Sequence, residues 1–284
     1  MTPYDPRRCQ LGEGPLWHPL RKQLFWFDIV GQKLLSQSDG RPLEWSFDEP
    51  VSAAGWVDKD SLLIASPTGL WHFNLTEGDK KLVAPLEREN GVTRSNDGRA
   101  DPWGGFWIGT MGCNAEPGAG AIYRFYNGNL RKLFGEITIS NAICFAPDRS
   151  VAYFTDTASA KLMQVPLDGH GWPNENPTVL IDFRAEGLNP DGAVTDRDGA
   201  LWIAQWGAAR IAVYSDTGMF QKTVPIPAAH TTCPAFGGDD MKTLFVTTAM
   251  QGIEKEQLES YDHHGQTFAI PNVGQGVPEP QVIL

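Results

Sequence analysis

Short apolar runs, each preceded by a polar turn, recur along the whole chain. The six runs occupy residues 24–27, 62–65, 106–109, 152–155, 201–204 and 244–247. They recur at roughly 40 to 50 residues, which is the repeat length of propeller blades built from four strands each. Sustained helical periodicity is lacking apart from a short helical turn expected near residues 253–258. The pattern therefore predicts an all-β fold.

A second strand of one type follows three of these runs, at residues 69–73, 121–125 and 209–214, and each leads into a polar turn. Six such units account for nearly the whole chain, and no linker or shift in composition divides it. We therefore expect residues 1–284 to form a single domain, a six-bladed β-propeller closed into a ring. The segment around Pro6 to Cys9 is expected to complete the last blade beside the C-terminal strands.

The composition agrees with many short strands broken by turns, because the 284 residues include 30 Gly, 21 Pro and 10 Trp. Hydrophobic residues make up 41% of the chain and charged residues 20%, which suits a folded core. Lys and Arg number 23 against 34 Asp and Glu, so the formal net charge is −11. This acidic surplus argues against nucleic acid as a partner.

The N-terminal residues carry charges and proline and have no apolar segment of the secretory type. No stretch approaches the roughly 18 apolar residues of a membrane helix. We therefore expect a cytoplasmic protein with no membrane partner, acting as a monomer or a weak homo-oligomer. The four cysteines are widely separated and show no C-x-x-C spacing, so reduced thiols are expected rather than disulfides or a structural zinc site.

One position about ten residues before each apolar run comes into register when the repeats are aligned. In a propeller, equivalent positions of the innermost strands face the central channel at one height, so these side chains should converge. Four of the six carry oxygen donors. The occupants are Glu13, Ala53, Asn96, Asn141, Asp191 and Cys233.

Two carboxylates and two amides facing one another would be costly to bury without a cation, water or substrate between them. Oxygen ligands of this kind suit Ca²⁺, Mg²⁺ or Mn²⁺. The simpler interpretation is turn chemistry, since Asn-Asp-Gly and Pro-Asp-Gly are ordinary turn tripeptides. Glu13 argues against that interpretation because Glu is not a turn former, and the register shared by the repeats argues against it further.

The sequence resembles the gluconolactonase and regucalcin-like (senescence marker protein) sugar lactonases over essentially its full length. Any one of the shared motifs is weak, but their order together is specific. The motifs are LGEGPLW at 11–17, RSNDG at 94–98 with GTM at 109–111, ISN at 139–141, YFTD at 153–156, PDG at 190–192 with LWIA at 201–204, and FGG at 236–238 with LFVTT at 244–248.

The resemblance implies one divalent metal ion, whose identity among Ca²⁺, Mg²⁺, Mn²⁺, Zn²⁺ and Fe²⁺ stays open. The metal ligands of the family fall on Glu13, Asn141 and Asp191. Its substrate-contacting residues fall on Arg94, Asn96 and Glu116. Glu116 lies four residues before Gly120. One departure concerns the residue after the ligand Asn, which is often Gly in the family and is Ala142 here.

Three protein ligands leave coordination positions for water and substrate, as at a catalytic ion. The reaction expected is opening of a sugar lactone to the aldonic acid by water attack on a metal-polarised carbonyl. Asp191 is the first choice for general base, because a carboxylate beside the metal can accept a proton from the attacking water, and Glu13 is the second choice.

Three other functions compare with that of a lactonase as follows: a serine hydrolase, a hydrolase of aryl esters or organophosphates, and a binding propeller. A serine hydrolase is disfavoured because no Gly-x-Ser-x-Gly sequence occurs. A calcium-dependent hydrolase of aryl esters or organophosphates would share the metal chemistry. A non-catalytic binding propeller would have no need of oxygen donors at four of the six channel positions.

Overall fold

The computed structural model describes residues 1–253 and 263–284, and most of the helical turn expected at residues 253–258 lies outside these ranges. The described residues form 24 strands and two short 3₁₀ helices, η1 (Thr157–Ser159) and η2 (Arg184–Glu186). All strand pairs given for the sheets are antiparallel, as expected for strands joined by tight turns. The prediction of an all-β chain is therefore confirmed for this part of the molecule.

Four of the sheets have four strands each, connected in sequence order. The first comprises β2 (Gly12–His18), β3 (Gln23–Asp28), β4 (Lys33–Ser38) and β5 (Arg41–Ser46). The second comprises β6 (Ala53–Asp58), β7 (Ser61–Ser66), β8 (Gly69–Asn74) and β9 (Lys80–Pro85). The third comprises β10 (Thr93–Ala100), β11 (Phe106–Gly112), β12 (Gly120–Tyr126) and β13 (Asn129–Ile137). The fourth comprises β14 (Ser140–Phe145), β15 (Val151–Asp156), β16 (Lys161–Pro166) and β17 (Thr178–Asp182).

The fifth sheet has eight strands, and it corrects the prediction of six separate blades. Its strands are β18 (Asn189–Thr195), β19 (Leu201–Trp206), β20 (Arg210–Tyr214), β21 (Phe220–Pro225), β22 (His230–Gly237), β23 (Thr243–Ala249), β24 (Thr267–Pro271) and β1 (Pro3–Asp5). The arrangement is thus propeller-like, with four four-stranded blades and one larger sheet.

A single pair of residues joins the two halves of the larger sheet. Trp206 at the end of β19 pairs with His230 at the start of β22. Their rings stack with centroids 4.0 Å apart, and the His230 imidazole is also held by the carbonyl of Gln251. The repeat in the sequence could not reveal this link, because it depends on two side chains that meet only in the folded chain.

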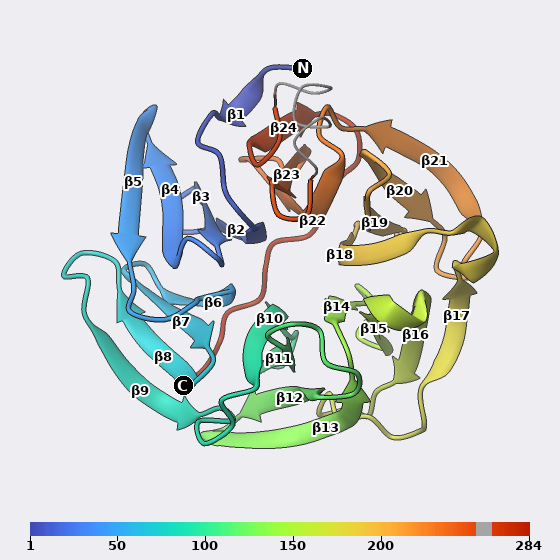
Figure 1. The fold of residues 1–284 in the computed structure, drawn as a ribbon, viewed down its shortest axis with the longest axis horizontal. Coiled ribbons are helices and arrows are strands. Elements are labelled where there is room, and N and C mark those ends of the chain that lie inside the picture. The colour runs from blue at the N-terminus through green and yellow to red at the C-terminus, as the bar shows by residue number, and fades with distance from the viewer. Residues whose placement is uncertain (254–262) are drawn as a thin grey trace.

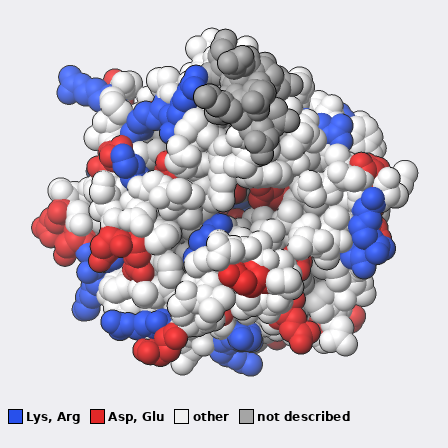
Figure 2. All heavy atoms as spheres, in the orientation of Figure 1, with Lys and Arg blue, Asp and Glu red and all other residues white. Residues whose placement is uncertain are grey.

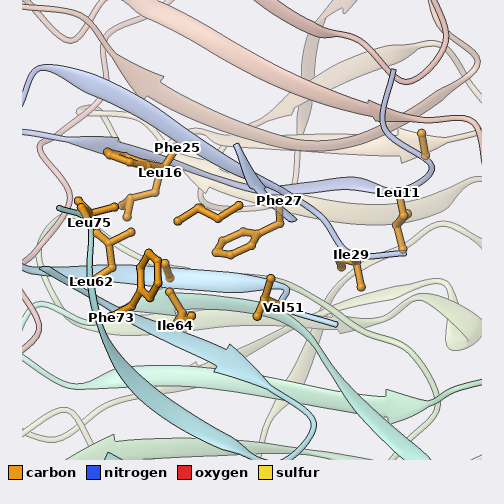
Figure 3. Close-up of a cluster of buried hydrophobic side chains, with 13 residues drawn as sticks. Leu11, Leu16, Phe25, Phe27, Ile29, Val51, Leu62, Ile64, Phe73 and Leu75 are labelled. Atoms are coloured by element: carbon orange, nitrogen blue, oxygen red, sulfur yellow. The ribbon is translucent and has the colours of Figure 1, made fainter. Parts of the chain in front are cut away.

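Six inner strands surround the centre of the ring: β2, β6, β10, β14, β18 and β22 (Figure 1). Each contacts the next in chain order, and β22 closes the circle onto β2. Most of the apolar core lies between neighbouring sheets. Between the first two sheets, Phe25 and Phe27 pack against Leu62, Ile64 and Phe73 (Figure 3). This packing fixes the ring that positions the central side chains.

The two chain ends close the structure. β1 pairs with β24, so an N-terminal strand does lie beside the C-terminal strands, although it covers Pro3–Asp5 rather than the segment around Pro6 to Cys9. After β24 the chain crosses the middle of the ring (Figure 1). Near its end, the amides of Val282 and Ile283 donate to the carbonyls of Trp56 and Gly104. Within the described residues, no helix is long and apolar enough to cross a membrane.

Candidate active site

A cavity of about 610 Å³ opens where the inner strands begin. Four of the six positions predicted to converge line it: Glu13, Asn96, Asn141 and Asp191. Arg94 lines it as well. The space-filling view shows a hollow near the centre of the ring with acidic atoms inside it (Figure 2). The channel register in the sequence therefore corresponds to a real gathering of polar side chains.

β-Bulges turn these side chains towards the centre. The register of β2 against β3 shifts between Glu13 and Leu16, and that of β14 against β15 shifts between Asn141 and Cys144. The pairing register of the strands that carry Asn96 and Asp191 also shifts next to these residues, between Ser95 and Gly98 and between Pro190 and Ala193. Bulges bend a strand and redirect a side chain, and they recur next to active sites.

Left-handed backbone follows two of the site residues. Gly14 after Glu13 has φ +53°, and Ala142 after Asn141 has φ +55°. Ala142 thus adopts the conformation for which glycine is favoured, and its side chain is fully buried. The alanine at this position leaves the bulge in place, so Asn141 is still presented to the cavity.

Arg94 begins a hydrogen-bond chain that determines how the amides are turned. Arg94 Nη1, which can only donate, lies 2.7 Å from Asn96 Oδ1. Asn96 Nδ2 donates to the Ser140 carbonyl at 2.8 Å and to Asn141 Oδ1 at 3.1 Å. Because the arginine cannot accept and the carbonyl cannot donate, the orientation of the Asn96 amide is settled at both ends.

The chain continues through a threonine. Asn141 Nδ2 lies 2.9 Å from Thr157 Oγ1, and Thr157 Oγ1 donates to the Pro190 carbonyl at 2.7 Å. Pro190 directly precedes Asp191. The polar groups of three strands, β10, β14 and β18, and of η1 are therefore connected into one network around the cavity.

The electrostatics of the site are dominated by buried carboxylates. Burial raises the pKa of Glu13 to about 8, and nearby Asp97 adds to the rise. Burial also raises the pKa of Asp191 well above its ordinary value, with Glu13 and Asp97 contributing. Burial lowers the pKa of Arg94, an effect that Glu13 and Asp191 oppose. Burial therefore favours the protonated form of both carboxyl groups, and the nearby Arg94 only partly opposes it.

The donor set fits a hard divalent cation. In the described part of the chain, no lysine or arginine forms an ion pair with Glu13 or Asp191. Asn141 Oδ1 accepts one hydrogen bond and has a second lone pair to offer. Two carboxylates and an amide oxygen are the ligand types that Ca²⁺, Mg²⁺ and Mn²⁺ accept. No three His, Cys, Asp or Glu side chains form a metal-binding group among the described residues, so an amide oxygen is needed to complete the set.

Glu116 is placed differently from the other predicted residues. It lies between β11 and β12, and its carboxylate accepts hydrogen bonds from the backbone and side-chain nitrogens of Asn114, both at 3.0 Å. Asn114 and Ala115 line the cavity, whereas Glu116 does not. The other two channel positions, Ala53 and Cys233, are buried outside this lining.

Several cavity residues were not singled out in the sequence. Thr157 follows directly after the YFTD motif, so its position next to a recognised motif was the available signal. Trp206 closes the strand that starts with LWIA, and its indole is backed by the stacked ring of His230. Asn189 and Gln251 add further polar atoms, for which no repeat position offered a signal.

Comparison with known proteins places this geometry in a family. Residues 11–250 match the family described as the SMP-30/Gluconolactonase/LRE-like region. The chain is 31% identical over 277 residues to the 6-deoxy-6-sulfogluconolactonase of Pseudomonas putida, covering 95% of this chain and 94% of that protein. It is 34% identical over 271 residues to the L-arabinolactonase of Azospirillum brasilense, covering 92% and 88% respectively.

A solved structure is similar over almost the entire fold. The calcium-binding protein regucalcin from Agrobacterium tumefaciens superposes with a TM-score of 0.97 at 37% identity, covering 99% of this chain and 97% of that one. The motifs, the ring of inner strands and the matches over nearly the full length agree. The chain therefore belongs to the SMP-30/gluconolactonase/LRE-like family.

Proposed function

We propose that this protein hydrolyses a sugar lactone to the open aldonic acid at the cavity lined by Glu13, Asn141 and Asp191, with the help of one divalent cation. The observation that supports this most strongly is the pair of buried carboxylates of Glu13 and Asp191, which have no ion-pair partner among the residues that the structure describes. Arg94 lines the same cavity and has N–H groups not used within the described chain. The lactonases among its relatives and the calcium-binding name of the structurally similar protein support the same proposal.

Glu13, Asn141 and Asp191 are the residues that would hold the cation. When bound, the cation would keep both carboxylates ionised and polarise the carbonyl group of the lactone. The buried surroundings give each of these oxygens a fixed direction, since all three side chains are at least 95% buried. The protein thus supplies preformed oxygen ligands, which become negatively charged where the cation replaces their protons.

Asp191 acts as general base in the proposed reaction. Its carboxylate takes a proton from water while the water oxygen forms a bond to the lactone carbonyl carbon. The bond between that carbon and the ring oxygen then breaks, and the proton passes from Asp191 to the leaving oxygen, which becomes a hydroxyl group.

Arg94 and Asn96 bind the hydroxyl groups of the sugar. Arg94 uses Nη1 for the Ser95 carbonyl and for Asn96, which leaves its other N–H groups for a ligand in the cavity. Glu116 would reach the substrate only by exchanging its bonds to Asn114 for bonds to the sugar. Its role as a substrate contact stays a prediction.

The test compares two substrate classes on the metal-stripped protein after addition of Ca²⁺, Mg²⁺, Mn²⁺ or Zn²⁺. Acid release from a panel of five- and six-membered aldonolactones is measured beside phenol release from an aryl ester. We expect metal-dependent turnover of at least one lactone, abolished by a chelator and restored by the ion. Turnover of the aryl ester alone would contradict the proposal in favour of an esterase.

A further inference from the structure

Thr157 occupies a place in the site that neither a ligand nor a substrate contact requires. It is the first residue of η1, and its backbone amide donates to the Ile139 carbonyl at 2.9 Å. The preceding Asp156 caps the same turn and also accepts from the amides of Thr138 and Ile139. The hydroxyl of Thr157 is therefore held at a fixed point between β14 and β18.

The donor and acceptor roles at the Thr157 hydroxyl can be assigned in only one way. The Pro190 carbonyl can only accept, so the single proton of Thr157 Oγ1 is directed to it. Towards Asn141 the hydroxyl can then only accept. The Asn141 side chain must therefore turn its NH₂ group to Thr157 and its oxygen towards Asn96.

We infer that Thr157 is a positioning residue for the divalent cation: its hydroxyl fixes the amide of Asn141 with the oxygen available as a ligand and ties it to the backbone carbonyl preceding Asp191. The inference rests on the proposed function, because it concerns the same cation. It goes beyond that function because one hydroxyl group, together with Asn96, orients one ligand and also holds the backbone next to another.

The effect of removing the Thr157 hydroxyl follows from these donor and acceptor roles. With valine at position 157 the Asn141 NH₂ group has no acceptor there, and the Pro190 carbonyl loses its donor. The bond from Asn96 Nδ2 is then the remaining side-chain hydrogen bond to the Asn141 amide, so its oxygen is held less firmly as a ligand. Removal of groups that orient metal ligands typically weakens metal binding about 10- to 100-fold.

The experiment measures the affinity of the metal-stripped protein for Ca²⁺ and for Mn²⁺ by isothermal titration calorimetry, with no lactone present. We expect Thr157→Val to raise the dissociation constant about 10- to 100-fold. Thr157→Ser keeps the hydroxyl and should bind as the unsubstituted protein does. At saturating ion, Thr157→Val should recover much of its lactone turnover, because the residue acts through Asn141 and not on the substrate.

Thr195→Val is the matched control. Thr195 lies on β18 and donates to the Phe145 carbonyl on β14 at 2.7 Å, so it links the same two sheets towards their other end. This variant loses an equivalent bond and some thermal stability, and its ion affinity should not change. Equal weakening in both variants would show general loosening of the sheets and overturn the inference.

The remaining outcomes separate this inference from the proposed function. Unchanged ion affinity in Thr157→Val overturns the inference even if lactones are hydrolysed. Weakened affinity in Thr157→Val without lactone turnover by the unsubstituted protein supports the inference and refutes the substrate. Failure of the unsubstituted protein to bind either ion overturns the inference, whereas the proposed function fails only if none of the four ions supports lactone turnover.

Discussion

Two arginines on β10, Arg94 and Arg99, lie towards opposite ends of the central channel and differ in whether a carboxylate pairs with them. Arg94 lies at the cavity, and among the described residues its side chain bonds only to the Ser95 carbonyl and the Asn96 amide. Arg99 lies at the other end, where it forms a buried ion pair with Glu279 and donates to the carbonyls of Ile143 and Ala193 at 3.2 Å. At the cavity end the arginine forms no ion pair with a described residue, whereas at the other end Arg99 is paired with Glu279.

The Arg99 end of the channel contributes to stability, and the Arg94 end is arranged for ligand binding. Glu279 belongs to the C-terminal segment, so its pairing with Arg99 anchors the part of the chain that crosses the ring. Trp56 Nε1 adds a bond to the Glu279 carbonyl at 2.8 Å. At the cavity end, Glu13 and Asp191 have no such partner, which costs stability in the free protein and leaves them ready for a ligand. The following predictions test this division.

The largest effect is expected for Asp191→Asn at the cavity end. The amide keeps the shape of the side chain but cannot take a proton, so the turnover number should fall about 10²- to 10⁴-fold while the protein stays folded. Steady-state kinetics on the best lactone at saturating ion measure this. Near-normal turnover with the ion still bound would transfer the role of base to Glu13 or to another group.

The two arginines should respond differently to the same substitution by methionine. Arg99→Met leaves Glu279 buried without its partner and should lower the free energy of unfolding by about 3 to 5 kcal/mol. Arg94→Met should change stability much less and lower kcat/KM about 10- to 100-fold, mainly through KM, because a charge-assisted hydrogen bond to the substrate is lost. Urea unfolding and kinetics on both variants test the contrast, and equal destabilisation by the two would refute it.

The pH dependence of stability should reveal the unpaired carboxylates. The pKa of Glu13 is raised to about 8 in the folded protein, so the folded state keeps a proton that the unfolded chain releases near its ordinary pKa of 4.5. The metal-free protein should therefore lose stability as pH rises from about 5 to 8, at about 1.4 kcal/mol per pH unit for one such proton.

Denaturant unfolding in the presence of a chelator at pH 5.5 and pH 8 measures this slope. Glu13→Gln provides the control, because it removes the group and should flatten the curve. Addition of Ca²⁺ should stabilise the protein more at pH 8 than at pH 5.5, since the ion competes with protons for the same oxygens. A slope that does not change in Glu13→Gln would contradict the assignment.

The smallest effect is expected at the bulge beside Asn141. In Ala142→Gly, relief of the left-handed backbone contributes about 1 kcal/mol and loss of the buried methyl group costs about 0.8 kcal/mol, so the two nearly cancel. Thermal unfolding and ion affinity should both stay close to those of the unsubstituted protein. Gly14→Ala is the informative contrast, because a Cβ there would collide with the Ser52 carbonyl oxygen and should destabilise the fold. A clear loss of ion affinity in Ala142→Gly would show that the alanine itself positions Asn141.

The site was predictable from the sequence where it follows the repeat. Glu13, Asn96, Asn141 and Asp191 could be found because each stands at one phase of its strand relative to an apolar run, and strands in equal phase bring equal positions to the cavity. Arg94 and Glu116 were implied by the resemblance to the sugar lactonases. Glu116 sits in a connection between strands, where the strand pattern does not fix the backbone, and the structure turns its carboxylate to Asn114.

What the sequence by itself determined is the all-β class and the channel register, because these depend on the local alternation of apolar runs and turns. Only the tertiary structure decided the rest. Trp206 and His230 join strands expected in separate blades, Thr157 orients Asn141, and Glu279 reaches Arg99 across 180 positions of the chain. Each of these depends on side chains brought together by packing of the whole ring, a contact that has no periodic signature along the chain.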